Sequence, residues 1–321
     1  MRAVEALREY LLGLLPDPGR AVREEERLYF ELLRDYPARG GKMLRGRLVL
    51  AVAEGLGAAR ERALPAAAAL ELFQNWVLIH DDIEDESEER RGKPALHRVH
   101  GVALALNAGD ALHALMWRTL VEAGYPREVL AEFAALVERT AYGQHLDLYW
   151  IERGVLNLTE EDYLEMVRNK TARYTAVAPL RLGFLLAGRE PPAVVAEAGE
   201  ELGVAFQLVD DVLNLEGDRR VYGKEIAGDL WEGKRTLILL DFLSRASPEE
   251  RRRAARLLRT PRERKEASEV AWLHRRLLES GSVARVRERA ERMAEEALSR
   301  LEPVVPEGAL AILRGLVFRR A

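Results

Sequence analysis

The chain has 321 residues, of which 48% are hydrophobic and 32% are charged, and its formal net charge is −4. These values describe a soluble globular protein with an ample core, and they give no sign of a nucleic-acid-binding surface. The absence of cysteine excludes disulfides, thiolate metal sites and a cysteine nucleophile, and it is compatible with a cytoplasmic location.

The first segment, MRAVEALREYLLGLLPDPG, has no basic region followed by a long apolar stretch and a small-residue cleavage site. We therefore predict an amphipathic helix rather than a signal peptide. No apolar run in the chain approaches the ~20 residues that a membrane-spanning helix needs. We expect no integral membrane segment and a cytoplasmic protein.

The rest of the chain predicts helix almost everywhere, because apolar residues recur three and four apart, Ala and Leu are abundant, and no convincing alternating run predicts a strand. Gly and Pro signals separate these helices at 16–19, 37–41, 55–65, 91–94, 124–126, 188–192, 217–223, 247–248, 260–261 and 303–308. Neither a linker nor a clear repeat divides the chain. We predict an all-α fold with one helical domain over residues 1–321.

The segment GGKMLR at residues 40–45 is the first that points to chemistry. Only six of the 49 basic residues are Lys, at positions 42, 93, 170, 224, 234 and 265. Lysine is a compact point charge suited to phosphate oxygens, whereas arginine prefers flat bidentate pairing. The lysines of GGKMLR, of NKT at 169–171 and at the two ends of GKEIAGDLWEGKRT at 223–236 are therefore candidate phosphate ligands.

The next segment is DDIED, inside an apolar helical pattern. On a helix, positions i, i+1 and i+4 share one face, so Asp81, Asp82 and Asp85 can present three carboxylates to one small volume. Magnesium would relieve their repulsion, because it takes oxygen ligands from one or two carboxylates and from substrate phosphates. A solvated acidic face is the alternative. However, only thirteen of the 53 acidic residues are Asp, so the acidic residues of an ordinary surface in this chain would be mostly Glu.

A second acidic pair, Asp210 and Asp211 in FQLVDDVLN, also lies in an apolar helical pattern. Between the two acidic motifs, Thr159 followed by acidic residues predicts the N-cap of the helix that carries Lys170. Two distant acidic clusters with lysines between and after them indicate a helical magnesium site that binds a diphosphate.

These segments together resemble the head-to-tail trans-prenyltransferases, the polyprenyl diphosphate synthases. The resemblance runs from about residue 40 to residue 236 and rests on GGKMLR, DDIED with RRG five residues on, NAGD, NKT, FQLVDD and GK…GD…GK.T, in that order. It implies a helical bundle around a central cavity. It also implies magnesium as cofactor, three ions in each active site, with manganese as a possible substitute.

The resemblance implies a role for each matching residue. The metal would be held by Asp81 and Asp85, with Asp210 opposite, and Asp82 completes the first catalytic motif. The allylic diphosphate would be bound by Arg90, Lys170, Gln207, Lys224 and Lys234, with the Thr171 hydroxyl near the reacting carbon. Isopentenyl diphosphate would be bound by Lys42, Arg45, Gln74 and Arg91. Most relatives end the second motif in Asp where this chain has Asn214, so we expect slightly weaker metal binding there.

Product length is argued from the residues before DDIED, along which the growing tail should run. Trp76 lies five residues before Asp81, Val77 lies four before it and Phe73 eight before it. A Trp is large enough to close a tunnel, although ordinary core packing is the alternative. An aromatic residue at this position, with a small residue after it, resembles the geranylgeranyl-forming type, with farnesyl diphosphate as the second choice.

Three rival functions are weaker. His80-Asp81 resembles the HD pair of metal-dependent phosphohydrolases, but that site needs an earlier His and His80 is the first in the chain. A class I terpene cyclase normally carries Ser or Thr and Glu in its second motif, and DDVLNLEGD offers no hydroxyl. A regulatory subunit typically loses the acidic motifs, which this chain keeps.

The partners implied by the resemblance are isopentenyl diphosphate, allylic diphosphates and a second copy of the chain. The Ala-rich stretches 63–72 and 101–114 could serve internal packing or a subunit face. We expect a homodimer and no nucleic-acid partner. The preferred allylic primer, and whether a membrane takes part in product release, stay open.

Overall fold

The computed structural model describes residues 2–217 and 225–318, and the predicted all-α fold is confirmed. Two compact units can be described separately. Unit 1 comprises Met1–Ala134, Ala178–Ala196 and Glu302–Leu313, and unit 2 comprises Ala135–Val177, Glu197–Leu301 and Arg314–Ala321. One domain over residues 1–321 stays a prediction.

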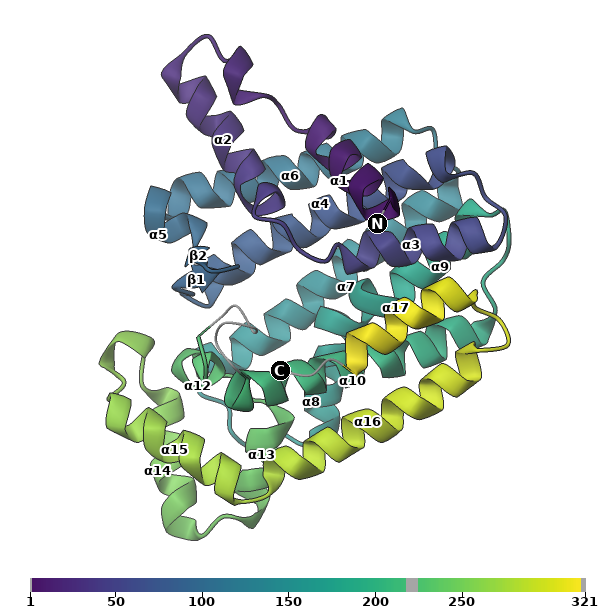
Figure 1. The fold of residues 1–321 in the computed structure, drawn as a ribbon. Helices are drawn as coiled ribbons and strands as arrows, with labels where there is room; N and C mark the ends of the chain where they lie inside the picture. The colour runs from purple at the N-terminus through teal and green to yellow at the C-terminus, as the bar shows by residue number, and fades with distance from the viewer. Residues whose placement is uncertain (1, 218–224, 319–321) are drawn as a thin grey trace. The chain divides into compact units, whose positions relative to one another are not determined.

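Unit 1 contains most of the helices of the first half of the chain (Figure 1). Its elements are α1 (Arg2–Leu14), the 3₁₀ turn η1 (Pro18–Arg20), α2 (Glu24–Ala38), α3 (Leu44–Gly55), α4 (Arg60–Glu84), β1 (Glu89–Arg90), β2 (Lys93–Pro94), α5 (Leu96–His100), α6 (Val102–Glu122), the first part of α7 (Arg127–Glu152), α9 (Ala178–Leu186), the start of α10 (Ala193–Glu216) and most of α17 (Glu307–Val317).

Helix α4 is the core of unit 1 and packs against α1, α3, α6 and α9. Its segment 66–75 is buried on every side, so the Ala-rich stretch 63–72 serves internal packing. A helix surrounded in this way needs small and apolar residues all round, and alanine is also the best helix former. The buried helix carries DDIED at its C-terminal end.

The predicted break at 55–65 is shorter in the structure, because α4 begins at Arg60 and continues through Pro65. A proline ring disturbs the preceding helical turn. The Tyr125 hydroxyl bridges the backbone groups of this turn, because it accepts a hydrogen bond from the Ala66 amide at 3.0 Å and donates one to the Arg62 carbonyl at 2.5 Å. A side chain from outside the helix therefore satisfies the backbone groups next to Pro65, where the Gly and Pro pattern of the sequence predicted a break.

A short antiparallel hairpin, which the sequence does not predict, follows α4. Strands β1 and β2 pair Glu89 with Pro94 and Arg90 with Lys93. Arg39, at the end of α2, donates to the carbonyls of Arg90 and Pro94, each at 2.9 Å. The hairpin is thereby fixed to α2, and it carries Arg90 and Arg91.

Unit 2 contains the end of α7, α8 (Glu160–Val167), the π-helix η2 (Arg168–Val177), most of α10, α12 (Gly228–Glu232), α13 (Leu237–Arg245), α14 (Pro248–Arg259), the 3₁₀ turn η3 (Arg262–Arg264), α15 (Ala267–Glu279), α16 (Ser282–Leu301) and the end of α17. The predicted N-cap of α8 is confirmed, since Thr159 and Asp162 form a capping box. Helix α10 buries Val204, Leu208 and Val212 in the core of unit 2. Within the described ranges, every helix is too short or too polar to span a bilayer.

Candidate active site

The GGKMLR segment lines a pocket of about 80 Å³ in unit 1. Gly40 and Gly41 have φ values of 85° and 145°, which glycine adopts without the penalty of a Cβ. The pocket brings together the four residues predicted to bind isopentenyl diphosphate, which come from the loop before α3, α3 itself, α4 and the hairpin: Lys42, Arg45, Gln74 and Arg91. Three cationic side chains around one small pocket suit a diphosphate.

Two polar residues of this pocket were missed by the sequence analysis. Glu71 is buried and accepts the Gly46 amide at 2.8 Å, while the Asn75 carbonyl oxygen accepts Arg91 Nη1 at 3.2 Å. Burial raises the pKa of Glu71, against the Gly46 hydrogen bond and the charge of Arg45, which lower it. Both residues lie on α4 upstream of DDIED. They are one helical turn apart, and this spacing, which puts them on one face of the helix with each other, was the signal that could have identified them.

In DDIED, the structure separates the three aspartates that the helical spacing grouped together. Asp81 has a side chain that is 21% exposed, whereas the Asp82 side chain is fully buried. Asp82 accepts hydrogen bonds from the Tyr36 hydroxyl at 2.5 Å and from Arg90 Nε at 3.0 Å. Asp85 is the C-cap residue of α4. Of the first adjacent pair, Asp81 is therefore the one with a solvent-accessible carboxylate.

Arg90, predicted to bind the allylic diphosphate, is 5% exposed and pairs with Asp82, while its Nη2 atom lies 3.5 Å from Asp81 Oδ2. Burial would lower the pKa of Arg90, but the Asp82 carboxylate outweighs it and raises that pKa. Burial, and then the charge of Asp82, raises the pKa of Tyr36. Both groups therefore stay protonated and act as donors to Asp82.

In unit 2, the NKT segment lies on the π-helix η2. A Cβ on Gly143 of α7 would meet the Lys170 backbone nitrogen at 2.1 Å, and one on Gly203 of α10 would meet Ala172 Cα at 2.3 Å. Only glycine allows such an approach. Two neighbouring helices therefore hold the backbone on both sides of Thr171, and π-helical turns are frequent at functional sites.

Two side chains of NKT are linked to buried acids, Lys170 directly and Thr171 through Gln207. Lys170 Nζ donates to Asp147 at 2.5 Å, and Asp147 is 3% exposed. The Thr171 hydroxyl donates to Gln207 at 2.9 Å, and the Gln207 amide donates to Asp211 at 2.8 Å. The sequence analysis missed Asp147, although the rarity of Asp in this chain was a signal for it.

The second acidic motif shows the same division between adjacent aspartates as the first. Asp210 is half-buried, whereas Asp211 is 4% exposed and accepts the Tyr163 hydroxyl at 2.6 Å. Burial raises the pKa of Asp211 to about 7, against the hydrogen bonds from Tyr163 and Gln207, which lower it. The sequence analysis gave Asp211 no role beyond the pair.

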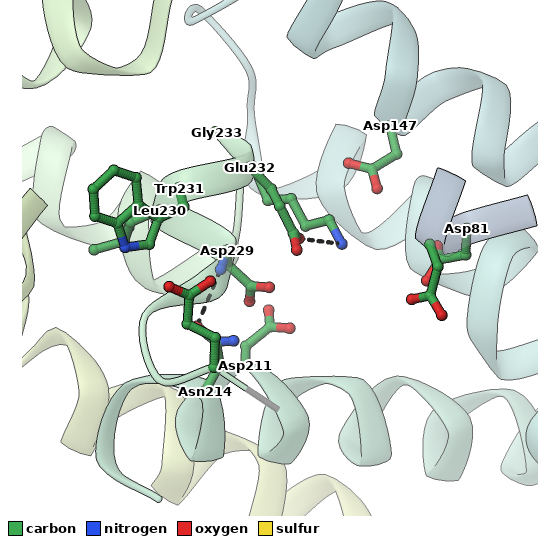
Figure 2. A network of polar contacts seen from close by, with 12 residues as sticks. Asp81, Asp147, Asp211, Asn214, Asp229, Leu230, Trp231, Glu232 and Gly233 are labelled. Carbon is green, nitrogen blue, oxygen red and sulfur yellow. Dashed lines mark hydrogen bonds and ion pairs between the residues drawn. The ribbon is translucent and has the colours of Figure 1, made fainter. Parts of the chain in front are cut away.

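Asn214, the last residue of the second acidic motif, is buried and hydrogen-bonded within unit 2. Its side-chain oxygen accepts the Asp229 amide at 3.3 Å, and its own carbonyl accepts the Ala227 amide at 2.7 Å. Figure 2 shows the contact with Asp229, and it shows the carboxyl groups of Asp211 and Asp229 turned toward one another. Asn214 thus connects α10 to the start of α12, in the GD segment.

The remaining lysines differ in role. Lys234 pairs with Glu232 at 2.9 Å, and Lys224 lies outside the described residues. Lys265 is buried, and its ammonium caps the end of α12 by donating to the carbonyls of Leu230 and Trp231. Lys93 is exposed on β2. Rarity alone therefore does not mark a lysine as a phosphate ligand.

The three chain-length candidates lie on α4. Trp76 stacks on His113 of α6 with ring centroids 3.9 Å apart, and Phe73 meets its edge at 5.5 Å. Phe73 is fully buried, whereas Trp76 and Val77 are half-buried. The Trp76 ring is thus held by neighbours on two sides, as a barrier would need to be, and its role as a plug stays a prediction.

The acidic residues present fit magnesium. Within residues 2–217 and 225–318, no three acidic or histidine side chains are grouped as a metal site. Magnesium does not require such a group, since one or two carboxylates commonly hold it together with waters and substrate phosphates. The half-buried Asp81 and Asp210 each offer one such carboxylate.

Comparisons with known proteins find similar chains. The profile of the polyprenyl synthetase family matches residues 26–276. The chain is 33% identical to a short chain isoprenyl diphosphate synthase of Methanothermobacter thermautotrophicus, over 99% of this chain and 95% of that one. It is 38% identical to a geranylfarnesyl diphosphate synthase of Aeropyrum pernix, over 66% of this chain and 69% of that one.

A solved structure shares the fold over nearly its whole length. It is a geranylgeranyl pyrophosphate synthase of Corynebacterium glutamicum complexed with isoprenyl diphosphate and magnesium. The TM-score is 0.89 at 28% identity, and the match covers 99% of both chains.

Proposed function

Because the chain belongs to the polyprenyl synthetase family and is a prenyltransferase, we propose that it condenses isopentenyl diphosphate with an allylic diphosphate and forms geranylgeranyl diphosphate. The observation that carries this proposal is the pocket in which Lys42, Arg45, Gln74 and Arg91 come together. A terpene cyclase has no use for a second diphosphate pocket.

We propose that Asp81, Asp85 and Asp210 are magnesium ligands. When bound, the metal would neutralise the allylic diphosphate and so assist cleavage of its C–O bond. Lys170 and Lys234 would supply fixed positive charge to the same diphosphate. The isopentenyl double bond then attacks the allylic cation, and the departed diphosphate accepts the proton that is lost. No protein side chain has to act as the base.

The product length is the finer part of the proposal. Trp76, backed by His113, supports a twenty-carbon product, because a large ring fixed by stacking can stop a growing tail. Farnesyl diphosphate is the second choice. The names of relatives include both geranylgeranyl and geranylfarnesyl diphosphate synthases, so a twenty-five-carbon product is a third outcome of the assay.

We also propose a cytoplasmic homodimer that pairs through α5 and α6. This part of unit 1 exposes several apolar side chains: Val99, Val102, Leu106 and Val121, which are 57%, 54%, 43% and 68% exposed. Exposed large apolar side chains on neighbouring elements support a protein contact. Light scattering should give twice the mass of the chain, and a stable monomer would refute this part.

The direct experiment incubates pure protein with magnesium, labelled isopentenyl diphosphate and, separately, dimethylallyl, geranyl or farnesyl diphosphate, and then sizes the dephosphorylated products. A single twenty-carbon alcohol is expected, and a matched incubation with chelator should give none. A fifteen-carbon alcohol would keep the reaction but place the barrier nearer the metals. No elongation with any primer, alongside cyclic hydrocarbon or free phosphate, would reject the proposed function.

A further inference from the structure

The two acidic motifs share a feature that lies outside the motifs themselves. In each, the second aspartate is buried and accepts a hydrogen bond from a buried tyrosine of another helix. Asp82 is paired with Tyr36 of α2, and Asp211 is paired with Tyr163 of α8. The four residues are 0%, 0%, 4% and 1% exposed, respectively. The first aspartate of each pair is half-buried.

In unit 1, the tyrosine fixes the residue that reaches Asp81. The Tyr36 hydroxyl donates to Asp82 Oδ2 and accepts the Leu96 amide at 3.2 Å, so its direction is set. Arg90 then binds both oxygens of Asp82 through Nε, and its Nη2 atom extends to within 3.5 Å of Asp81. A carboxylate held on one side by Tyr36 therefore orients Arg90 on the other.

In unit 2, the tyrosine begins a similar chain of contacts. Tyr163 donates to one oxygen of Asp211, and the other oxygen accepts the Gln207 amide at 2.8 Å. This contact fixes the Gln207 side chain so that its oxygen accepts the Thr171 hydroxyl at 2.9 Å. Each anchored aspartate thus binds a side chain, Arg90 or Gln207, that is predicted to bind the allylic diphosphate.

We propose that Tyr36 and Tyr163 are positioning residues, which hold Asp82 and Asp211 so that these carboxylates orient Arg90 and Gln207 toward a magnesium-bound diphosphate. The inference rests on the proposed function. It separates the adjacent aspartates by task, since the first of each pair is the proposed metal ligand while the second anchors a substrate-binding side chain.

Tyr36 offers an internal control for this inference. Its backbone carbonyl accepts Arg91 Nη1 at 2.5 Å, and Arg91 lines the isopentenyl pocket. Its hydroxyl donates to Asp82 instead, so the two contacts of Tyr36 use different parts of the residue. Tyr36→Phe removes the hydroxyl alone. Binding on the allylic side should weaken, and the KM for isopentenyl diphosphate should stay within about twofold of wild type.

The test measures inorganic diphosphate binding in the presence of magnesium, by calorimetry on the whole chain. Tyr36→Phe and Tyr163→Phe should each weaken binding on the order of tenfold, because a hydrogen bond to a charged group is lost. Tyr29→Phe and Tyr149→Phe, at exposed positions, should bind as wild type does. If Tyr36→Phe does not fold, Tyr163→Phe tests the positioning role in unit 2.

The outcomes separate this inference from the proposed function. Variants that melt at a lower temperature but bind magnesium and diphosphate as tightly as wild type would overturn it, since the tyrosines would then be structural only. A wild-type protein that elongates no primer, with both tyrosine variants still weakened in diphosphate binding, would reject the proposed function and keep the positioning role.

Discussion

Gly143→Ala should damage the site although it replaces none of the predicted ligands. The new Cβ would lie 2.1 Å from the Lys170 nitrogen and 2.6 Å from its Cα, where ordinary contacts begin at 3.4 Å, so the backbone would have to retreat by roughly 1 Å. Overpacking of this kind costs about 1 to 3 kcal/mol. Against this, alanine in a helix gains about 1 kcal/mol over glycine.

The displaced atoms belong to NKT, so Lys170 and Thr171 would move relative to Asp147 and Gln207. A shift of about 1 Å can cost on the order of a hundredfold in rate. Urea unfolding gives the stability, and elongation kinetics give kcat and KM. Gly13→Ala is the matched control, because its Cβ meets nothing within 4 Å, and it should be neutral or stabilising. If Gly143→Ala matched wild type in both stability and kcat/KM, the reasoning would fail.

Three further predictions concern single side chains. Trp76→Ala should lengthen the product by at least one five-carbon unit, as sized by chromatography, and an unchanged product would place the barrier elsewhere. Lys42→Ala should raise the KM for isopentenyl diphosphate about tenfold or more, whereas Lys93→Ala, at an exposed lysine, should not; equal effects would reject the pocket. Burial lowers the pKa of Lys265 from 10.5 to about 8. Between these values the unfolded chain binds more protons, so stability should rise with pH by up to about 1.4 kcal/mol per unit relative to Lys265→Met, and a pH-independent difference in urea unfolding would contradict the assignment.

The sequence predicted much of the fold because its signals are local. The apolar spacing, the Thr159 cap and most of the breaks were sufficient for the all-α fold, and the order of the motifs was sufficient for the family. The helix that continues through Pro65 was not predictable in this way, because the Tyr125 hydroxyl that repairs it comes from 59 residues away. The hairpin depends similarly on Arg39.

The candidate site divides along the same line. Its residue types were proposed from the sequence alone: aspartates for metal, lysines for phosphate and an aromatic residue upstream of DDIED. Helical spacing alone treats Asp81 and Asp82 as equivalent, because adjacent residues on a helix differ only by rotation. Which of them is buried depends on what packs beside the helix, and that is Tyr36, which is 46 residues away in the chain. Helical periodicity is a local property, but burial and hydrogen-bond partners belong to the packed chain, so only the tertiary structure could separate Asp81 from its buried neighbour.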